Sequence, residues 1–316
     1  LNPLAYILSR AKVNPPTKRE VLARLKELER GCQEGSAAIP DRSDPITVVF
    51  HPHTLEQLAY LKIALTDSRE DVFIRATILG ILHGKYRRNG TDSIYLSVDM
   101  PNTFSMSPGY IRKYAREKGL QYLTLDVFAN TRRRIEWLYR RGRPVARGEA
   151  YQLDVRRLHE VVPPESIQLV VSSPPYLKVV KYGLYNWIRL WFLDVPLDEV
   201  DRSLDDGHAL PSYLEFMGET LRQLERLLQP GGMAALVIGD VAKNGEPPVD
   251  LAAAVWEAVK PGTSLQLLDI VPDAIADSAK VTKIWNETRG RATAVDRILV
   301  LCKGDRPGVN HPTVSW

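Results

Sequence analysis

The sequence predicts an α/β fold built on a doubly wound parallel sheet, and three patterns in its second half indicate this class. The apolar run Ile167–Val171 is too short for a usual helix and too continuous for a half-exposed strand, so we expect a strand buried on both faces. A helical pattern carries Leu221, Leu224 and Leu227 on one side. It leads through Pro230-Gly231-Gly232 into a second apolar run over residues 233–240. Helix, turn and strand in this order are what a sheet with crossover helices requires.

The remaining elements follow from periodicity and from helix-capping residues. The stretch from Thr17 to Arg30 reads as a charged helix, and His51-Pro52 reads as a turn and cap before the next helix. Gly84 is expected to end a further helix. We therefore expect helices over residues 17–30, 55–65, 71–83 and 127–138, and a last strand over residues 297–303.

Composition excludes several classes of protein. Hydrophobic residues make up 44% of the 316 residues and charged residues 25%, which is ordinary for a globular protein, and no run approaches the length of a membrane-spanning helix. Cys32 and Cys302 are too far apart in sequence to suggest a disulfide framework or a zinc motif. His51 and His53 have no third ligand nearby, so we expect no metal site. Because no run is long enough to span a membrane, we also expect no membrane partner. The net charge of +4 permits nucleic-acid binding without demonstrating it.

The segment Ser173-Pro174-Pro175-Tyr176 is the candidate catalytic site. Two prolines cannot extend the strand that precedes them, so the chain leaves the sheet there in a fixed direction. Ligands of open α/β sheets bind just beyond the carboxyl ends of strands. The loop offers a hydroxyl, a carbonyl followed by no N–H, and an aromatic face. These groups suit a planar base whose exocyclic amine donates hydrogen bonds.

This motif resembles the catalytic motif of S-adenosylmethionine-dependent amino-methyltransferases that act on nucleic-acid bases. The resemblance continues in order through residues 148–158, 228–232, 238–240 and 297–303, so it covers most of residues 148–303. It implies a class I, Rossmann-like methyltransferase core with S-adenosyl-L-methionine as cofactor. Serine in the first position implies methylation of the N4 amine of cytosine in DNA, with the base flipped out of the duplex and stacked on Tyr176.

The same resemblance implies cofactor-binding residues. Asp154 matches the family's acidic residue near the adenine amine, although an Asp in this position is equally well explained as a helix cap. Ser172 and Asn2 are the other cofactor-binding candidates. Asn2-Pro3 resembles the segment after the family's second strand, where an acidic residue and a glycine-rich loop come earlier in the chain. We therefore expect the printed sequence to begin inside the cofactor domain.

Arginines gather between the apolar positions of residues 127–143. Arg132, Arg133 and Arg134 are expected to contact phosphates, because arginine with few acidic neighbours is typical of such contacts. Arg112 and Lys113 follow a segment rich in Ser, Pro and aromatic residues and are the second nucleic-acid-binding candidates. A solvated basic face explains the first group as well, and a surface loop with buried aromatic residues explains the second.

These observations divide the chain into four segments. Residues 1–44 would complete the cofactor domain, 45–147 would form an inserted target-recognition region, 148–306 the catalytic core and 307–316 a tail. The predicted function is N4-cytosine DNA methylation in restriction-modification or epigenetic marking, in a prokaryotic cytoplasm and associated with the nucleoid. Two alternatives stay open: methylation of an N6-adenine in DNA or of an RNA base amine, and a nucleic-acid-binding subunit without catalysis. A homodimer or a partner subunit is compatible with each.

Overall fold

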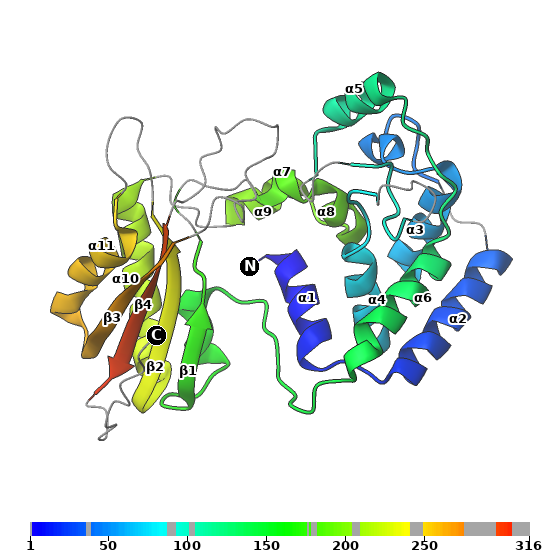
Figure 1. The fold of residues 1–316 in the computed structure, drawn as a ribbon. Helices are drawn as coiled ribbons and strands as arrows, with labels where there is room; N and C mark the ends of the chain where they lie inside the picture. Colours follow the sequence, from blue (N-terminus) through cyan, green and yellow to red (C-terminus); the bar gives the residue numbers. More distant parts are fainter. Residues whose placement is uncertain are drawn as a thin grey trace. The chain divides into compact units, whose positions relative to one another are not determined.

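The chain folds into two compact units with different architectures. The computed structural model describes residues 2–35, 39–86, 93–100, 105–175, 177, 182–203, 209–240, 249–274 and 295–304. The first unit comprises Leu1–Gln152 and Lys181–Leu204, and the second comprises Leu153–Val180 and Asp205–Trp316. The first is helical and the second contains a sheet with helices, so the predicted α/β class is confirmed (Figure 1).

The first unit is built from helices that pack around α4. Both α1 and α2 contact α4, and α6 contacts α2 and α4. The helices are α1 (Pro3–Val13), α2 (Lys18–Glu34), α3 (Pro52–Ala64), α4 (Arg69–Leu79), α5 (Pro108–Lys118), α6 (Val127–Leu138), α7 (Tyr182–Tyr185), α8 (Trp187–Leu193) and α9 (Leu197–Ser203), with 3-10 turns at η1 (Pro45–Val48) and η2 (Tyr139–Arg141).

Several helix starts agree with the sequence, but two helix ends do not: α2 continues past the predicted end at Arg30 to Glu34, and α4 ends early. Thr17 caps α2 in a capping box: its hydroxyl accepts from the Glu20 N–H, and Glu20 Oε2 accepts from the Thr17 N–H at 2.7 Å. The predicted helix over residues 71–83 was wrong at its end, because α4 stops at Leu79. Beyond Gly80 the chain turns, and the Ile81 carbonyl accepts from the Leu96 N–H instead of continuing the helix.

One apolar core runs through the first unit. It includes Leu4 from α1, Leu25 from α2, Leu58 from α3, Ile74 from α4 and Phe128 from α6. Residues 1–44 therefore share a core with the region that follows them, so no boundary between cores lies at residue 44. The functional division predicted there stays a prediction.

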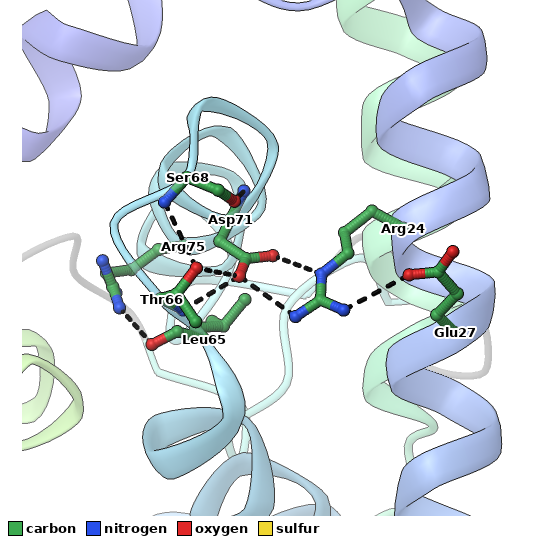
Figure 2. Close-up of polar contacts among 7 residues, drawn as sticks. All are labelled: Arg24, Glu27, Leu65, Thr66, Ser68, Asp71 and Arg75. Atoms are coloured by element: carbon green, nitrogen blue, oxygen red, sulfur yellow. Dashed lines mark hydrogen bonds and ion pairs between the residues drawn. The ribbon is translucent and has the colours of Figure 1, made fainter.

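A buried carboxylate joins α2 to α4 (Figure 2). Asp71 accepts from Arg24 Nε at 2.8 Å and Nη2 at 3.1 Å, and from the Thr66 N–H at 2.9 Å and hydroxyl at 2.7 Å. Burial opposes ionisation of Asp71, but the bonds from Arg24 and Thr66 outweigh it and hold the pKa of this carboxyl below its ordinary value. This network holds α2 against the first turn of α4.

The second unit contains a four-stranded mixed sheet of order β1-β2-β4-β3. β1 and β2 are parallel, and β4 is antiparallel to both β2 and β3, so the carboxyl ends of β1, β2 and β3 meet at one edge. The elements are η3 (Val155–Glu160), β1 (Ile167–Ser172), α10 (Leu210–Leu227), β2 (Leu228–Gly239), α11 (Leu251–Val259), η4 (Lys260–Gly262), β3 (Leu265–Ala274) and β4 (Val295–Lys303).

One face of this sheet is covered by α10 and α11, which also pack on each other (Figure 1). Leu236 of β2 and Leu299 of β4 are buried in the same cluster as Leu221 and Val255 of the two helices. The predicted helix before Pro230 and the last strand are both present.

The expectation that β1 is buried on both faces was wrong. Val170 packs against the covered core, but Leu169 and Val171 are 59% and 70% exposed. β1 is also an edge strand of the described sheet, with β2 on one side only. A continuous apolar run usually indicates a strand that is covered on both faces. Here the described residues leave the face with Leu169 and Val171 largely uncovered.

Pro230-Gly231-Gly232 lies inside β2 as an irregularity, where the sequence predicted a turn before the strand. Ile167 pairs with Leu228, whereas Leu169 pairs with Met233. A Cβ on Gly232 would lie 2.8 Å from the Gln229 carbonyl oxygen and 2.9 Å from that of Ile167, so this close approach of two strands requires glycine.

Among the helices that the structure describes, none has the length and apolar character that crossing a bilayer requires.

Candidate active site

The predicted catalytic loop leaves the sheet at the carboxyl end of β1. Ser172 is the last residue of the strand, and its side chain and that of Ser173 are exposed. Pro174 is buried and Pro175 half-buried, and Leu177 is buried in the core of the second unit. The backbone of the loop is thus anchored while the Ser173 hydroxyl faces outward. Tyr176 lies outside the described residues.

A buried carboxylate lies at the same edge of the sheet as this loop. Asp240 follows the end of β2 and is buried. It accepts from Arg297 Nε at 2.9 and 3.1 Å and from Arg297 Nη2 at 3.0 Å. Arg297 also lies 3.1 Å from Asp250, the residue that caps α11. This pairing ties β2, β4 and α11 together. The contact between Asp240 and Arg297 was not predicted from the sequence, because the partners are 57 positions apart.

Asp296 is a further acceptor that the sequence analysis missed. It pairs with Gly239 in the register of β4 against β2, close to the strand ends. Its Oδ1 atom is buried and has no hydrogen-bond partner in the part of the chain that the structure describes. A buried acceptor without a donor is costly, so this atom is suited to a donor from a ligand.

Asp154 caps the 3-10 helix η3, as the simpler interpretation of the sequence predicted. Its Oδ1 accepts from the Arg156 N–H and Nε, each at 2.9 Å, and its Oδ2 accepts from Arg156 Nη2 at 2.6 Å. The hydrogen bond from the Arg156 side chain is the main reason why the pKa of Asp154 lies below its ordinary value. Three of the roughly four acceptor positions of this carboxylate are therefore used within the chain.

Asn2, the other cofactor-binding candidate, caps α1 in the first unit. Its side-chain oxygen accepts from the Leu4 N–H at 3.0 Å and the Ala5 N–H at 3.3 Å. Both contacts satisfy the free N–H groups of the helix start. A cofactor role for Asn2, Asp154 and Ser172 stays a prediction.

The three consecutive arginines of α6 have different surroundings. Arg132 Nη2 lies 2.6 Å from Glu29 Oε2 on α2. Arg133 Nη2 donates to the Ser93 carbonyl at 2.8 Å. The guanidinium of Arg134 lies over the Trp137 ring, 4.2 Å from its centroid. Arg132 thus has a carboxylate partner, whereas Arg134 is held against an exposed aromatic ring. The sequence analysis missed this role of Trp137, although an i, i+3 spacing of Arg and Trp on a predicted helix indicates it.

The second group of basic candidates lies on α5. Arg112 lines an open cleft of about 620 Å³ together with Arg116 and Tyr122. Lys113 lies 3.8 Å from Glu117, one turn further along the helix. Phosphate binding by these residues stays a prediction.

His51 caps helix α3, and His53 supplies the N–H group that it binds. His51 Nδ1 accepts from the His53 N–H at 3.2 Å at the start of α3, and His51 Nε2 lies 3.3 Å from the Thr124 hydroxyl. Within the described ranges, no group of three His, Cys, Asp or Glu side chains is placed to hold a metal ion.

No protein-family model matches this chain, and no curated protein matches it. It is similar to solved structures of TTHA0409 from Thermus thermophilus, provisionally assigned as a DNA modification methylase. One is 22% identical, covers 51% of this chain and 56% of that one, and has a TM-score of 0.31. Another, complexed with S-adenosyl-L-methionine, is 21% identical over 51% and 54%, also with a TM-score of 0.31. The cytosine-N4-specific PvuII DNA methyltransferase is 18% identical over 50% and 49%, with a TM-score of 0.35. The chain spans about half the length of the structures it matches, and similarity at this level assigns no function to it.

Proposed function

We propose that this protein is an S-adenosylmethionine-dependent DNA methyltransferase that modifies the exocyclic N4 amine of a flipped-out cytosine. The observation that carries the proposal is the position of Ser173-Pro174-Pro175 directly after β1, in a parallel pair whose other strand ends in Gly239 at the same edge. Ligands of such sheets bind at this edge. The sequence resemblance over residues 148–303 supports the same assignment.

The loop residues would act on the acceptor amine. The lone pair of a cytosine amine is delocalised into the ring, so the free base is a poor nucleophile. Ser173 Oγ and the Pro174 carbonyl would each accept one N–H of the amine, which localises the lone pair and directs it outward from the loop. The Pro174 carbonyl is available because Pro175 has no N–H and the strand has ended. Catalysis by positioning of this kind needs no covalent intermediate with the protein.

Two acceptor groups of the second unit fit part of the cofactor. S-adenosylmethionine supplies an electrophilic methyl group when it is bound. Asp154 keeps roughly one acceptor position on Oδ2 for an adenine amine, and Asp296 Oδ1 is an unpartnered acceptor near the strand ends of the described sheet. The described residues offer no glycine cradle in a strand-loop-helix context for the rest of the molecule, so we assign to them only these polar contacts.

A DNA substrate requires that the target base leave the stack. A base inside a duplex cannot reach an anchored loop such as this one, and extrusion costs a few kcal/mol. The proposal includes a location with the bacterial nucleoid and a role in restriction-modification or epigenetic marking. An N6-adenine in DNA, an RNA base amine and binding without catalysis are the alternatives.

The test is transfer of a labelled methyl group from S-adenosylmethionine to DNA by the wild-type protein and by Ser173→Ala. We expect the variant to lose on the order of 10²–10³ in turnover, because one acceptor for the amine is lost. Ser166→Ala is the matched control: Ser166 is exposed at the opposite end of β1, where its hydroxyl donates to the Pro163 carbonyl. Digestion of the product to nucleosides distinguishes N4-methylcytosine from N6-methyladenine. Unchanged turnover in Ser173→Ala would remove Ser173 from the site, and absence of transfer in the wild type would favour binding without catalysis.

A further inference from the structure

A basic cleft with an exposed tryptophan lies in the first unit, on elements that the methyl-transfer proposal does not use. The cleft has a volume of about 560 Å³, which is in the range of small-ligand sites. We call it the Trp137 cleft, and it is lined by Lys85, Ser93, Ile94, Tyr95, Arg133, Arg134, Trp137 and Arg140.

The walls of the Trp137 cleft carry positive charge. Lys85, Arg134 and Arg140 line it, and no carboxylate of the described residues does. In the described part of the chain, none of these three side chains forms an ion pair, whereas Arg132 of the same helix is paired with Glu29. Such a surface attracts anions, because no carboxylate among the described residues neutralises these three cations.

The cleft wall is held rigidly against α6. The Ser93 carbonyl accepts from Arg133 Nη2 at 2.8 Å and from Asn130 Nδ2 at 3.2 Å. The segment around Ser93 and Tyr95 is thereby fixed to the helix that carries Trp137. Arg133 therefore shapes the wall of the cleft.

Trp137 is an unusual aromatic residue for the wall of a basic cleft. Its side chain is 51% exposed, although tryptophan is usually well buried. The Arg134 guanidinium lies over the indole ring at 4.2 Å and so orients both groups. A flat exposed ring beside several cations is the arrangement on which proteins stack nucleic-acid bases while they hold the adjoining phosphates.

We propose that the Trp137 cleft binds an unpaired nucleic-acid strand, with a base stacked on Trp137 and the neighbouring phosphates at Lys85, Arg134 and Arg140. The inference rests on the proposed function in taking nucleic acid as the partner. A duplex hides the faces of its bases, so only an unpaired nucleotide can use the indole ring. Arg134 also lines a second groove of about 340 Å³ that carries Lys12 and Arg143, which extends the cationic path for the backbone.

The test is binding of a fluorescein-labelled oligothymidylate and of a duplex of the same length, measured by anisotropy without S-adenosylmethionine. We expect the single strand to bind more tightly and to quench tryptophan fluorescence in the wild type. Trp137→Ala should weaken single-strand binding about tenfold, within the range expected for one lost base–aromatic stack, and Trp137→Phe should retain most of it. Arg140→Gln should lower the slope of log affinity against log salt by about one unit.

Arg30→Gln is the charge-matched control, because Arg30 is exposed on α2 and lies outside the cleft. Equal weakening by Arg30→Gln and Arg140→Gln would overturn the proposal in favour of general charge attraction. Equal affinity for duplex and single strand with no effect of Trp137→Ala would overturn it as well, as would binding of oligoglutamate as tight as that of oligothymidylate. Because no methyl donor is present, failure of this binding and failure of Ser173-dependent transfer are separate results.

Discussion

The two units bury their apolar residues in different ways. In the first, helices on several sides enclose α4, and Ile74 and Ile78 have no exposed surface. In the second, α10 and α11 cover one face of the sheet: Leu236 of β2 is 1% exposed, while Leu169 of the neighbouring strand is 59% exposed. The same residue type in adjacent strands therefore contributes very differently to stability, and the difference follows from which face has helices over it.

The units also differ in the polar groups that they bury. The first contains a fully buried aspartate, Asp71, and a buried histidine, His83, both inside the helical core. The second has Asp240 at the carboxyl edge of its sheet, where Arg297 neutralises it. Buried charge in the first unit fixes helix packing, whereas in the second it lies beside the candidate active site.

The largest expected effect separates the two faces of the sheet. Leu236→Ala should lower the free energy of unfolding by about 4 kcal/mol, because it leaves a cavity under α10 and α11. Leu169→Ala, the same change on the uncovered face, should cost less than about 0.5 kcal/mol. Urea unfolding followed by circular dichroism measures both. Similar losses in the two variants would mean that the uncovered face is packed in solution.

The next effect concerns the buried aspartate of the first unit. Asp71→Ala should cost about 3 kcal/mol, because Arg24 loses its partner and Thr66 loses its acceptor. Asp67→Ala is the matched control: this side chain is 83% exposed and lies 3.6 Å from Arg10 and Arg75, so its loss should be below about 0.5 kcal/mol. Hydrogen exchange should show faster opening of α2 and α4 in Asp71→Ala with the amides of β2 and β4 unchanged. Equal loosening of both units would mean that they open together.

The smallest effect is a pH dependence of the first unit that arises from a buried histidine. Burial, with a smaller contribution from the Arg189 charge, lowers the pKa of His83 to about 3, and its Nε2 lies 3.2 Å from the Ser105 hydroxyl. The unfolded chain binds this proton near pH 6.5 and the folded chain does not, so stability is fully present above pH 6.5 and falls as the pH drops toward 3. Between about pH 6.5 and about pH 4.5 the loss should be about 2 kcal/mol.

His83→Gln should flatten this slope, because it removes the titrating ring, even though it lowers the overall stability. His53→Gln, at an exposed position of α3, should leave the slope as it is. Thermal unfolding at several pH values measures all three proteins. A slope that survives in His83→Gln would assign the effect to another group.

Local signals predicted much of the fold. The charged stretch from Thr17, His51 before Pro52, and the leucines of α10 indicated helix starts and faces correctly, because these features depend on residues a few positions apart. The end of α4 and the exposure of β1 could not be predicted in this way. Both depend on contacts between distant segments: Leu96 bonds to Ile81, and in the described sheet only β2 pairs with β1.

The candidate site was predictable to the same extent. Ser173-Pro174-Pro175 was placed correctly after a strand, because proline ends strands by its own chemistry. The pairing of Asp240 with Arg297, the Asp296 Oδ1 atom without a partner among the described residues, and the exposure of Trp137 were not predictable. Each arises when antiparallel strands or separate helices are brought together, and single-residue propensities do not carry that information.

The free edge of β1 has a practical consequence for anyone who handles this protein. In the described sheet the strand is bonded to β2 alone, so the backbone N–H and C=O groups of its other edge pair with no described strand. A strand from another molecule can pair with such an edge. The exposed apolar side chains of Leu169 and Val171 favour this association further. Concentrated solutions should therefore form oligomers by strand addition, and a lysine at position 169 or 171 is the substitution to try first when a monomeric sample is needed.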